Sequence, residues 1–384
     1  MAAKNIVILG STGSIGISTL KVIERYPARF RVFALSAYNN VQLLEKQIHT
    51  FRPRYAVVSD RGMEYFRGRS LNGTKLLHVD HDLEDIVARR SVSHVVIGMR
   101  GSAALGPFLS AVNNGKTVAP ANKEALVIAG ELIMRQARRH NAVIVPVDSE
   151  QSAIFQCLQG QNRPELKKIY LTASGGTLRT VARQRFDKLS VAEILNHPRW
   201  KMGKKITVDS ATLMNKGFEI IEALRLFDLT VEQVEVVIHP EAIIHSMVEY
   251  VDGSIIAQLG VTDMRIPIQY ALTYPQRLDA GLKPLNFARL KSLNFEKPDY
   301  RKFPALSLAV AVARQAGTLP SLLNAADEEA VEAFLNKQIK LTDIYRSVEK
   351  VVARHRVRAK PNLNQILEAD VWAREETRKV ISEL

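Results

Sequence analysis

The stretch of this 384-residue chain with the most distinctive chemistry runs from Thr207 to Glu219 and has the sequence TVDSATLMNKGFE. Asn215, Lys216 and Glu219 fall at positions i, i+1 and i+4 of a predicted helix, so they lie near one face of it. Ser210 and Thr212 are candidate caps for the start of this helix. An amide, an ammonium and a carboxylate side by side suit an anion and a metal ion. The alternative is a solvated first turn with an ordinary Lys216–Glu219 pair.

A second group of oxygen ligands follows a predicted strand at 142–147. Asp148 and Glu150 flank Ser149 directly after this strand. Two carboxylates at i and i+2 can hold a divalent cation, and a set of oxygen ligands favours Mg²⁺ or Mn²⁺ over zinc. The alternative is that Asp148 caps a helix and Glu150 lies in its first turn.

Two further segments carry groups that suit a bound ligand. Residues 174–176, Ser-Gly-Gly, follow a predicted strand at 168–173, and their hydroxyl and amides suit an anion. A plain turn explains them equally well. The basic segment 197–205, HPRWKMGKK, places Trp200 and Met202 where the chain has no periodic pattern. We predict a mobile lid over a ligand, with an ordinary packed loop as the alternative.

The elements that must position these groups begin with a dinucleotide-binding pattern. A predicted strand at 4–9 runs into residues 10–16, Gly-Ser-Thr-Gly-Ser-Ile-Gly, and a helical pattern follows at 17–25. In this context the glycines let the backbone approach a pyrophosphate at the helix N-terminus. After the next predicted strand, at 31–36, residues 37–40 contain no acid to bind a ribose 2′-hydroxyl, which favours NADP over NAD. The same stretch contains no Arg or Lys either.

Strands and helices continue to alternate up to about residue 150. Further strands are predicted at 55–58, 76–79, 94–97, 117–119 and 142–147, and helices at 41–51, 103–113 and 122–140. Repeated β/α units with short connections predict an α/β fold with a doubly wound, parallel, Rossmann-like sheet. Ligands of such sheets bind beyond the carboxyl ends of the strands, where Asn122, Lys123 and Asp148 are expected.

Beyond residue 150 the pattern predicts a central α+β catalytic domain and then a C-terminal helical bundle. Helices are predicted at 151–158, 183–196 and 210–227, and strands at 168–173, 234–238, 243–251 and 254–259, with a hairpin turn at Asp252-Gly253. The expected division is a cofactor domain at 1–150, a catalytic domain at 151–274 with a lid at about 197–207, a linker at 275–305 and a bundle of about four helices at 306–384.

Composition excludes several classes of protein. No apolar run reaches the roughly 18 residues that span a bilayer, and the predicted N-terminal strand leaves no room for a signal peptide. The single cysteine, Cys157, fits a reducing compartment such as the cytoplasm. The net charge of +14 suits nucleic acid, an anionic membrane or anionic small molecules. The basic residues are mostly scattered, however, and the cluster at 354–360 lacks aromatics for stacking, so we expect neither nucleic acid nor membrane as a partner.

These motifs resemble those of the 1-deoxy-D-xylulose 5-phosphate reductoisomerase family along the whole chain. The matching segments, in order, are Gly10–Gly16, Ala121–Glu124, Pro146–Glu150, Ser174–Gly176, His197–Gly203, Asp209–Gly217, Ile238–Pro240 and Ile244-His245. The resemblance implies a homodimer that depends on NADPH and on Mg²⁺ or Mn²⁺, with Co²⁺ a further candidate. The implied reaction converts 1-deoxy-D-xylulose 5-phosphate, a small phosphorylated sugar, to 2-C-methyl-D-erythritol 4-phosphate in the non-mevalonate route to isoprenoids.

The resemblance also implies roles for individual residues. The metal ligands are Asp148, Glu150 and Glu219, which form the catalytic group together with Lys123. The substrate-binding residues are Ser149, Glu150, Ser174, His197, Trp200, Met202, Ser210, Asn215, Lys216 and Glu219. The cofactor-binding residues are Ser11, Thr12, Gly13, Ser14, Ile15, Asn40, Asn122, Lys123, Glu124 and Gly203.

The chain departs from the family pattern in three places. Tyr38 and Asn39 stand where relatives often have Lys, Arg or Ser near the 2′-phosphate, so the residues that read this phosphate are not assigned. Gln151 stands where some relatives have His, and segment 98–106 is longer than the usual glycine-alanine turn. A second enzyme class, the semialdehyde or homoserine-type NADP dehydrogenases, would share the glycine turn. Enzymes of that class do not need three carboxylates to meet at a metal ion.

Overall fold

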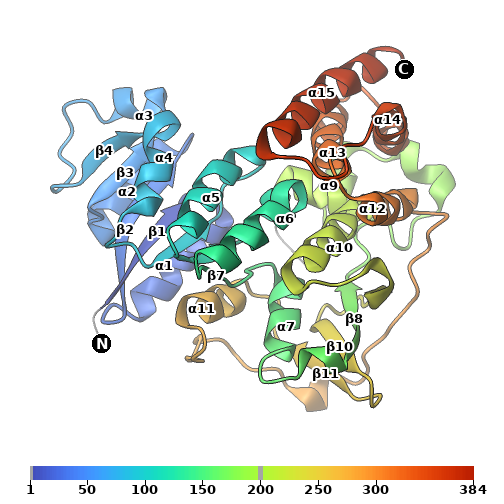
Figure 1. Cartoon of the computed structure of the whole chain (residues 1–384), viewed down its shortest axis with the longest axis horizontal. Coiled ribbons are helices and arrows are strands. Elements are labelled where there is room, and N and C mark those ends of the chain that lie inside the picture. The colour runs from blue at the N-terminus through green and yellow to red at the C-terminus, as the bar shows by residue number, and fades with distance from the viewer. Residues whose placement is uncertain (1–2, 198–201) are drawn as a thin grey trace. The chain divides into compact units, whose positions relative to one another are not determined.

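The computed structural model describes residues 3–197 and 202–384 and divides the chain into two compact units (Figure 1). The first unit comprises Met1–Ala125, Glu131–Ser152 and Asp263–Lys283. The second comprises Leu126–Gly130, Ala153–Thr262 and Pro284–Leu384. Segment Asp263–Lys283 belongs to the first unit, so the units do not share the bounds of the expected domains. The functional division at 150, 274 and 305 stays a prediction.

A seven-stranded sheet forms the centre of the first unit, with the order β4-β3-β2-β1-β5-β6-β7. Its strands are β1 Lys4–Leu9, β2 Phe30–Ala37, β3 Tyr55–Val58, β4 Lys75–His78, β5 His94–Ile97, β6 Thr117–Pro120 and β7 Val143–Ile144. All the neighbouring pairs are parallel. The strand order reverses at β1 and β5, and ligands of doubly wound sheets bind beyond the carboxyl ends of the strands at such a point.

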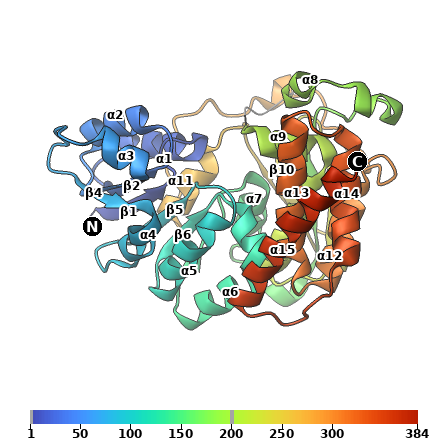
Figure 2. The same cartoon turned by 90° about the horizontal axis from the view of Figure 1, so that it is seen from above.

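Helices cover both faces of this sheet, with α1 and α2 on one face and α4 and α5 on the other (Figure 2). Those assigned wholly or partly to the first unit are α1 Ser14–Arg25, α2 Val41–Phe51, α3 Asp60–Tyr65, α4 Val79–Ala88, η1 Ser102–Ala104, α5 Leu105–Asn113, α6 Lys123–Arg139, α7 Ser149–Cys157 and α11 Arg265–Thr273. The structure confirms the predicted alternation and adds α3, α4 and α11, which the sequence patterns did not indicate. The short β7 is the only described part of the predicted strand at 142–147 that pairs as a strand.

The second unit contains a mixed four-stranded sheet with the order β11-β10-β8-β9. Its strands are β8 Leu166–Ala173, β9 Val234–Ile238, β10 Ile244–Tyr250 and β11 Ile255–Leu259. β8 and β9 are parallel, whereas β10 is antiparallel to β8 and β11. The predicted hairpin between β10 and β11 is confirmed, and Gly253 takes the left-handed conformation in its turn, with φ +86°.

The remaining elements of the second unit are mostly helical. They are η2 Arg163–Glu165, η3 Arg183–Lys188, α8 Val191–Leu195, α9 Lys204–Thr212, α10 Met214–Phe227, η4 Val231–Gln233, η5 Phe287–Arg289, α12 Pro304–Gln315, α13 Leu319–Leu335, α14 Leu341–Arg354 and α15 Leu363–Ser382. The predicted C-terminal helices are confirmed. The continuous helix expected at 183–196 is wrong, because Leu189 and Ser190 are extended and separate η3 from α8.

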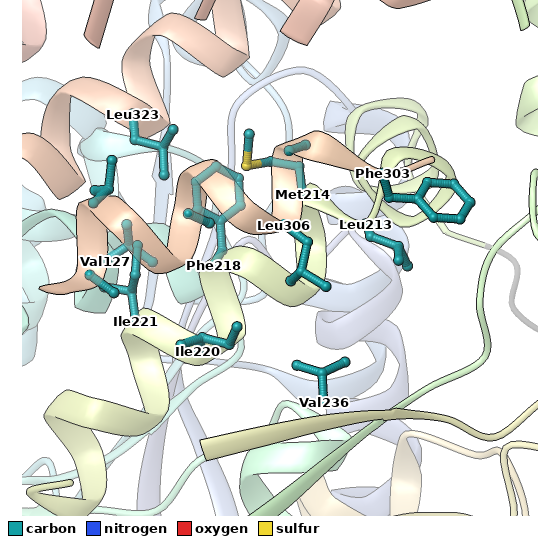
Figure 3. Packing of buried hydrophobic residues seen from close by; sticks show 14 of the residues in the cluster. Val127, Leu213, Met214, Phe218, Ile220, Ile221, Val236, Phe303, Leu306 and Leu323 are labelled. Atoms are coloured by element: carbon teal, nitrogen blue, oxygen red, sulfur yellow. The ribbon is translucent and has the colours of Figure 1, made fainter. Parts of the chain in front are cut away.

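Helix α10 runs through the hydrophobic core of the second unit. Met214, Phe218 and Ile221 belong to one buried cluster with Leu306 of α12 and Leu323 of α13 (Figure 3). At Gly217, a Cβ would lie 2.4 Å from that of Ala309, so α12 packs directly on the α10 backbone. This packing fixes the orientation of the helix that carries Asn215, Lys216 and Glu219. Among the described residues, the helices fall short of the length and apolar character that crossing a membrane requires.

Candidate active site

The turn between β1 and α1 is built so that only glycine fits at two of its positions. Gly10 has φ +82°, and a Cβ there would lie 2.9 Å from the carbonyl carbon of Gly98. At Gly16, a Cβ would lie 2.4 Å from the Cα of Ser11. The N-cap residue of α1, Gly13, offers no side-chain hydrogen bond to the helix. The first N–H groups of α1 have no acceptor within the helix, and this arrangement fits the pyrophosphate of a dinucleotide.

The predicted cofactor residues of this turn differ in exposure. Ser11 is buried, its Oγ donates to Gln47 Oε1 at 2.7 Å, and its carbonyl accepts from Gln47 Nε2 at 2.9 Å. Its side chain therefore ties the turn to α2. Gly13 and Ser14 are exposed, whereas Thr12 and Ile15 are half-buried. No sequence pattern indicates Gln47, because its partner lies on another element.

Two asparagines predicted to line the cofactor groove cap helices of the first unit. The Oδ1 of Asn40 accepts from the backbone N–H of Leu43 at 3.1 Å, at the start of α2. Asn122 is buried, and its Oδ1 accepts from the backbone N–H of Ala125 at 2.8 Å, at the start of α6. Glu124, in the first turn of α6, is half-buried. Both caps lie just beyond a strand, at the edge of the sheet where ligands of this fold bind.

Asn122 also fixes the segment after β5, whose conformation the sequence left open. Its Nδ2 donates to the carbonyl of Met99 at 2.8 Å and to that of Gly101 at 3.2 Å. Gly101 has φ +66°, and the chain then enters η1 and α5. One amide thus joins the carboxyl ends of β5 and β6.

Replacing Asn122 with alanine should lower the free energy of unfolding by about 2–3 kcal/mol, because one helix cap and two buried hydrogen bonds are lost. It should also weaken NADPH binding, because segment 98–101 loses its support. Urea unfolding and a fluorescence titration with NADPH measure the two effects. The matched control is Asn362→Ala, which removes the cap that α15 of the second unit receives at Gln365. Equal NADPH affinity in both variants would contradict the prediction.

An ammonium and a carboxylate meet beyond the ends of β6 and β7. Lys123 Nζ lies 2.8 Å from Asp148 Oδ2, and both side chains are nearly buried. The other oxygen, Oδ1, accepts from the backbone N–H of Glu150 at 3.2 Å, so Asp148 does cap α7. Ser149 Oγ donates to Glu150 Oε2 at 2.8 Å. A helix cap and a metal ligand are compatible roles for Asp148, because Oδ1 makes the cap and Oδ2 faces the ammonium of Lys123.

Three predicted substrate residues of the second unit meet at one imidazole. His197 Nε2 lies 3.3 Å from Ser174 Oγ, at the end of β8, and 3.1 Å from Ser210 Oγ, in α9. At Gly176, with φ +64°, a Cβ would lie 2.3 Å from the carbonyl oxygen of Ser210, so this turn packs tightly on α9. Burial lowers the pKa of His197, which favours a neutral ring at neutral pH. Two hydroxyls, a ring nitrogen and a glycine turn can together surround an oxyanion.

The start of α10 brings the other predicted residues together. Asn215 Nδ2 donates to Glu219 Oε1 at 2.6 Å, and Lys216 Nζ donates to Glu219 Oε2. The prediction that these three side chains share one face of a helix is therefore confirmed. The alternative of a solvated pair is wrong, because Lys216 and Glu219 are 4% and 1% exposed. The two candidate caps differ in outcome. Leu213, with φ +62°, separates α9 from α10, so Ser210 lies within α9 and does not cap α10. Thr212 Oγ1 accepts from the backbone N–H of Met214 at 3.4 Å, at the start of α10.

The predicted lid is described only in part. Trp200 lies outside the described residues. Met202 and Gly203 are half-buried, and Gly203 is the N-cap residue of α9, where its carbonyl accepts from the N–H of Thr207 at 3.1 Å. Closure of this segment over a ligand stays a prediction, as does a contact of Gly203 with the cofactor.

Comparison with protein families covers most of the chain. Residues 6–130 match the family model of 1-deoxy-D-xylulose 5-phosphate reductoisomerase, 144–227 match its C-terminal domain, and 259–376 match the DXP reductoisomerase C-terminal domain. The 1-deoxy-D-xylulose 5-phosphate reductoisomerase of Pelotomaculum thermopropionicum is 48% identical over 385 residues, 99% of each chain.

The chain belongs to the 1-deoxy-D-xylulose 5-phosphate reductoisomerase family.

Solved structures of reductoisomerases agree with this assignment. A DOX-P reductoisomerase in complex with NADPH, fosmidomycin and magnesium has a TM-score of 0.93 and 40% identity, and the match covers 99% of this chain and 98% of that one. The enzyme from Zymomonas mobilis, in complex with NADPH, has a TM-score of 0.91 and 39% identity, with all of both chains covered. The predicted family, the α/β fold class and the oxidoreductase activity are confirmed.

Proposed function

We propose that this chain converts 1-deoxy-D-xylulose 5-phosphate to 2-C-methyl-D-erythritol 4-phosphate, with NADPH and Mg²⁺ or Mn²⁺, in the non-mevalonate route to isoprenoids. The observation that carries the proposal is its 48% identity, over 99% of both chains, to a reductoisomerase. The reaction rearranges a keto sugar phosphate and reduces the aldehyde that forms. The chain must therefore hold a divalent cation, a phosphate and a nicotinamide cofactor.

The divalent cation is assigned to Asp148 and Glu150 of the first unit and Glu219 of the second. A set of carboxylate oxygens suits Mg²⁺ and Mn²⁺ and also accepts Co²⁺. When bound, the ion stabilises negative charge that develops on the oxygens of the substrate. In support of this assignment, each unit holds an ammonium against such a carboxylate, Lys123 on Asp148 and Lys216 on Glu219.

The substrate phosphate is assigned to Ser174, His197, Ser210, Asn215 and Lys216. The two hydroxyls and the amide can donate to phosphate oxygens, and Lys216 brings the positive charge that a dianion needs. Phosphate lies away from the reacting carbons, so these contacts supply remote binding energy and orientation. Ser149, Trp200 and Met202 are assigned to the rest of the substrate by resemblance.

The cofactor is assigned to the turn from Ser11 to Gly16, with Thr12, Gly13, Ser14 and Ile15 at the pyrophosphate. NADPH supplies the hydride that reduces the aldehyde. Asn40, Asn122, Glu124 and Gly203 complete the list of assigned cofactor residues. Lys123 is assigned to the junction of cofactor and substrate, where its ammonium can polarise a substrate oxygen or move a proton.

We further propose a cytoplasmic homodimer. The edge strand β11 begins with the half-exposed Ile255, and Val251, in the turn directly after β10, is 65% exposed. Exposed apolar residues at a sheet edge favour pairing with a second copy. The single buried thiol, Cys157, suits a reducing compartment.

The decisive experiment follows NADPH oxidation at 340 nm with 1-deoxy-D-xylulose 5-phosphate as the substrate. Turnover should stop when a chelator removes divalent cations and should return when Mg²⁺ or Mn²⁺ is added. Aspartate semialdehyde, an aldehyde that a homoserine-type dehydrogenase can reduce with NADPH, serves as the control substrate and should give no turnover. Metal-independent activity on the control substrate would instead support the second enzyme class.

A further inference from the structure

A second charged cluster of the second unit has no role in the proposed reaction. Lys205 Nζ lies 2.7 Å from Asp209 Oδ2 and 2.7 Å from Asp327 Oδ2. The side chains of the two acids are only 4% and 1% exposed, whereas Lys205 is 21% exposed. Burial, and next the neighbouring Asp327 carboxyl, raise the pKa of Asp209. One ammonium thus faces two carboxyls in the interior.

The cluster connects three helices through one nitrogen atom. Lys205 and Asp209 belong to α9, and Asp327 belongs to α13. Lys205 Nζ also lies 4.6 Å from the centre of the Phe218 ring of α10. Buried charges are costly unless they are paired, and breaking such a pair leaves a charge without compensation. Each of the three helices is therefore held in place relative to the ammonium.

The same turn of α9 carries part of the proposed phosphate site. Ser210 follows Asp209 directly, and its Oγ lies 3.1 Å from His197 Nε2. The turn at Gly176 packs against the carbonyl oxygen of Ser210, where a Cβ would approach to 2.3 Å. A shift of this turn would therefore move a hydroxyl, an imidazole and a glycine turn together.

The start of α10 depends on the same contacts. Leu213, with φ +62°, joins α9 to α10, so the direction of α10 follows the last turn of α9. Lys216 lies two residues before Phe218, whose ring faces Lys205. The ammonium therefore lies against both helices that supply phosphate ligands.

We infer that Lys205, held between Asp209 and Asp327, is a positioning residue for the phosphate site. It sets the last turn of α9 and the first turns of α10 relative to α13, so that Ser210 and Lys216 converge on one phosphate. The inference rests on the proposed function, because it assumes that these residues bind the phosphate of the substrate.

Lys205→Met tests the inference, because methionine keeps an unbranched side chain and removes the ammonium. The Michaelis constant for 1-deoxy-D-xylulose 5-phosphate should rise by about tenfold to a hundredfold, the scale expected when a distant change misplaces a binding group by about 1 Å. Affinity for NADPH should stay unchanged. Asp327→Asn keeps the shape of the side chain and one acceptor oxygen, and it should give a smaller rise in the same Michaelis constant. This second variant keeps the inference testable if Lys205→Met does not fold.

Arg374→Met is the matched control. Arg374 also bridges two helices through acids, with Nη2 at 2.6 Å from Glu328 Oε2 and Nη1 at 3.3 Å from Glu329 Oε1 on α13, and Nε at 2.7 Å from Asp370 Oδ2 on α15. Its loss should lower the melting temperature without changing the Michaelis constant. If Lys205→Met and Asp327→Asn lower the melting temperature as the control does, and neither changes this constant, the cluster serves stability alone and the inference is wrong.

Binding of inorganic phosphate separates this inference from the proposed function, because it needs no turnover. Calorimetry on the NADPH-loaded chain should give a weaker phosphate affinity for Lys205→Met than for Arg374→Met and the unchanged chain. Equal affinity in all three would overturn the positioning role and leave the proposed function intact. If the unchanged chain binds no phosphate, the proposed phosphate site fails and the inference fails with it.

Discussion

Replacing Glu219 with glutamine should lower kcat for NADPH oxidation with 1-deoxy-D-xylulose 5-phosphate by about 10³-fold, because the proposed metal site loses one of three charged ligands. An amide has almost the same shape as the carboxylate but no charge. Asn215 and Lys216 donate to different oxygens of Glu219, and the single oxygen of the amide can still accept from one of them. The fold of α10 should therefore survive the change.

We expect a large effect because losing a metal ligand destabilises the transition state more than it destabilises the fold. A cation that stabilises developing negative charge contributes several kcal/mol to catalysis, and each 1.36 kcal/mol is about a tenfold change in rate. Affinity for NADPH should be unchanged, because the glycine turn belongs to the first unit and Glu219 to the second. Fluorescence titration with NADPH and a Mn²⁺ titration of kcat measure the two effects separately.

Glu249→Gln is the control for loss of a buried glutamate. Glu249, on β10, is also buried and accepts from Lys167 at 2.7 Å and from the hydroxyl of Tyr170 at 2.5 Å. This variant should keep its kcat and its dependence on metal. If Glu219→Gln behaves in the same way as Glu249→Gln, Glu219 is not a metal ligand and the proposed site must be revised.

The parts of the fold that the sequence predicts well are those determined by neighbouring residues. The strand at Lys4–Leu9, the glycine turn and the start of α1 are contiguous, and each signal supports the next. The hairpin across Gly253 is likewise local, because the turn residue and the flanking strands lie within a few positions. Such elements need no knowledge of the rest of the molecule.

The elements that were missed or misjudged depend on tertiary packing. Leucine favours helices, yet Leu213 takes a left-handed conformation between two helices while its side chain is buried in the core. Nothing local indicates this break. Helix α4 is short, and its buried positions, Leu83, Ile86 and Val87, cover barely more than one turn, so its periodicity is weak.

In the candidate site, too, local features can be predicted from the sequence and tertiary contacts cannot. Motifs identify the types of residue, but they do not identify partners. Lys123 and Asp148 are 25 residues apart and meet only because β6 and β7 are neighbours in the sheet. Lys205 lies in a stretch that reads only as basic, and its partner Asp327 belongs to a helix of the C-terminal bundle. A sequence pattern alone cannot distinguish such a buried ammonium from a solvated one.

Replacing Lys216 with alanine should raise the Michaelis constant for 1-deoxy-D-xylulose 5-phosphate by about 10–100-fold, because a charge-assisted hydrogen bond contributes about 1.5–3 kcal/mol and each 1.4 kcal/mol is a tenfold change in affinity. The effect on kcat should be smaller, since the phosphate is remote from the reacting carbons and its contacts are present before and during the reaction. Steady-state kinetics at saturating NADPH and metal give both constants. Lys216→Met, which keeps most of the buried volume, should show the same rise without the cavity that alanine leaves.

The contacts of Lys216 sharpen this prediction. Its ammonium donates to Glu219 and its side chain is only 5% exposed, so it already offsets the charge of a proposed metal ligand. A divalent cation and this ammonium compete for the same carboxylate, and removing the ammonium should not weaken binding of the metal. The Mn²⁺ concentration needed for half-maximal activity should therefore stay equal or fall, while the Michaelis constant for the sugar phosphate rises.

Lys168→Ala is the matched control for loss of a paired lysine. Lys168 Nζ lies 2.6 Å from Glu235 Oε2 on the mixed sheet, and no proposed ligand contacts this pair in the described part of the chain. This variant should keep both constants. A collapse of NADPH affinity in Lys216→Ala, with an unchanged Michaelis constant for the sugar phosphate, would assign Lys216 to the cofactor. If only the response to Mn²⁺ weakens, Lys216 supports the metal site instead. In both of these outcomes the positive charge of Lys216 would act on a group other than the phosphate.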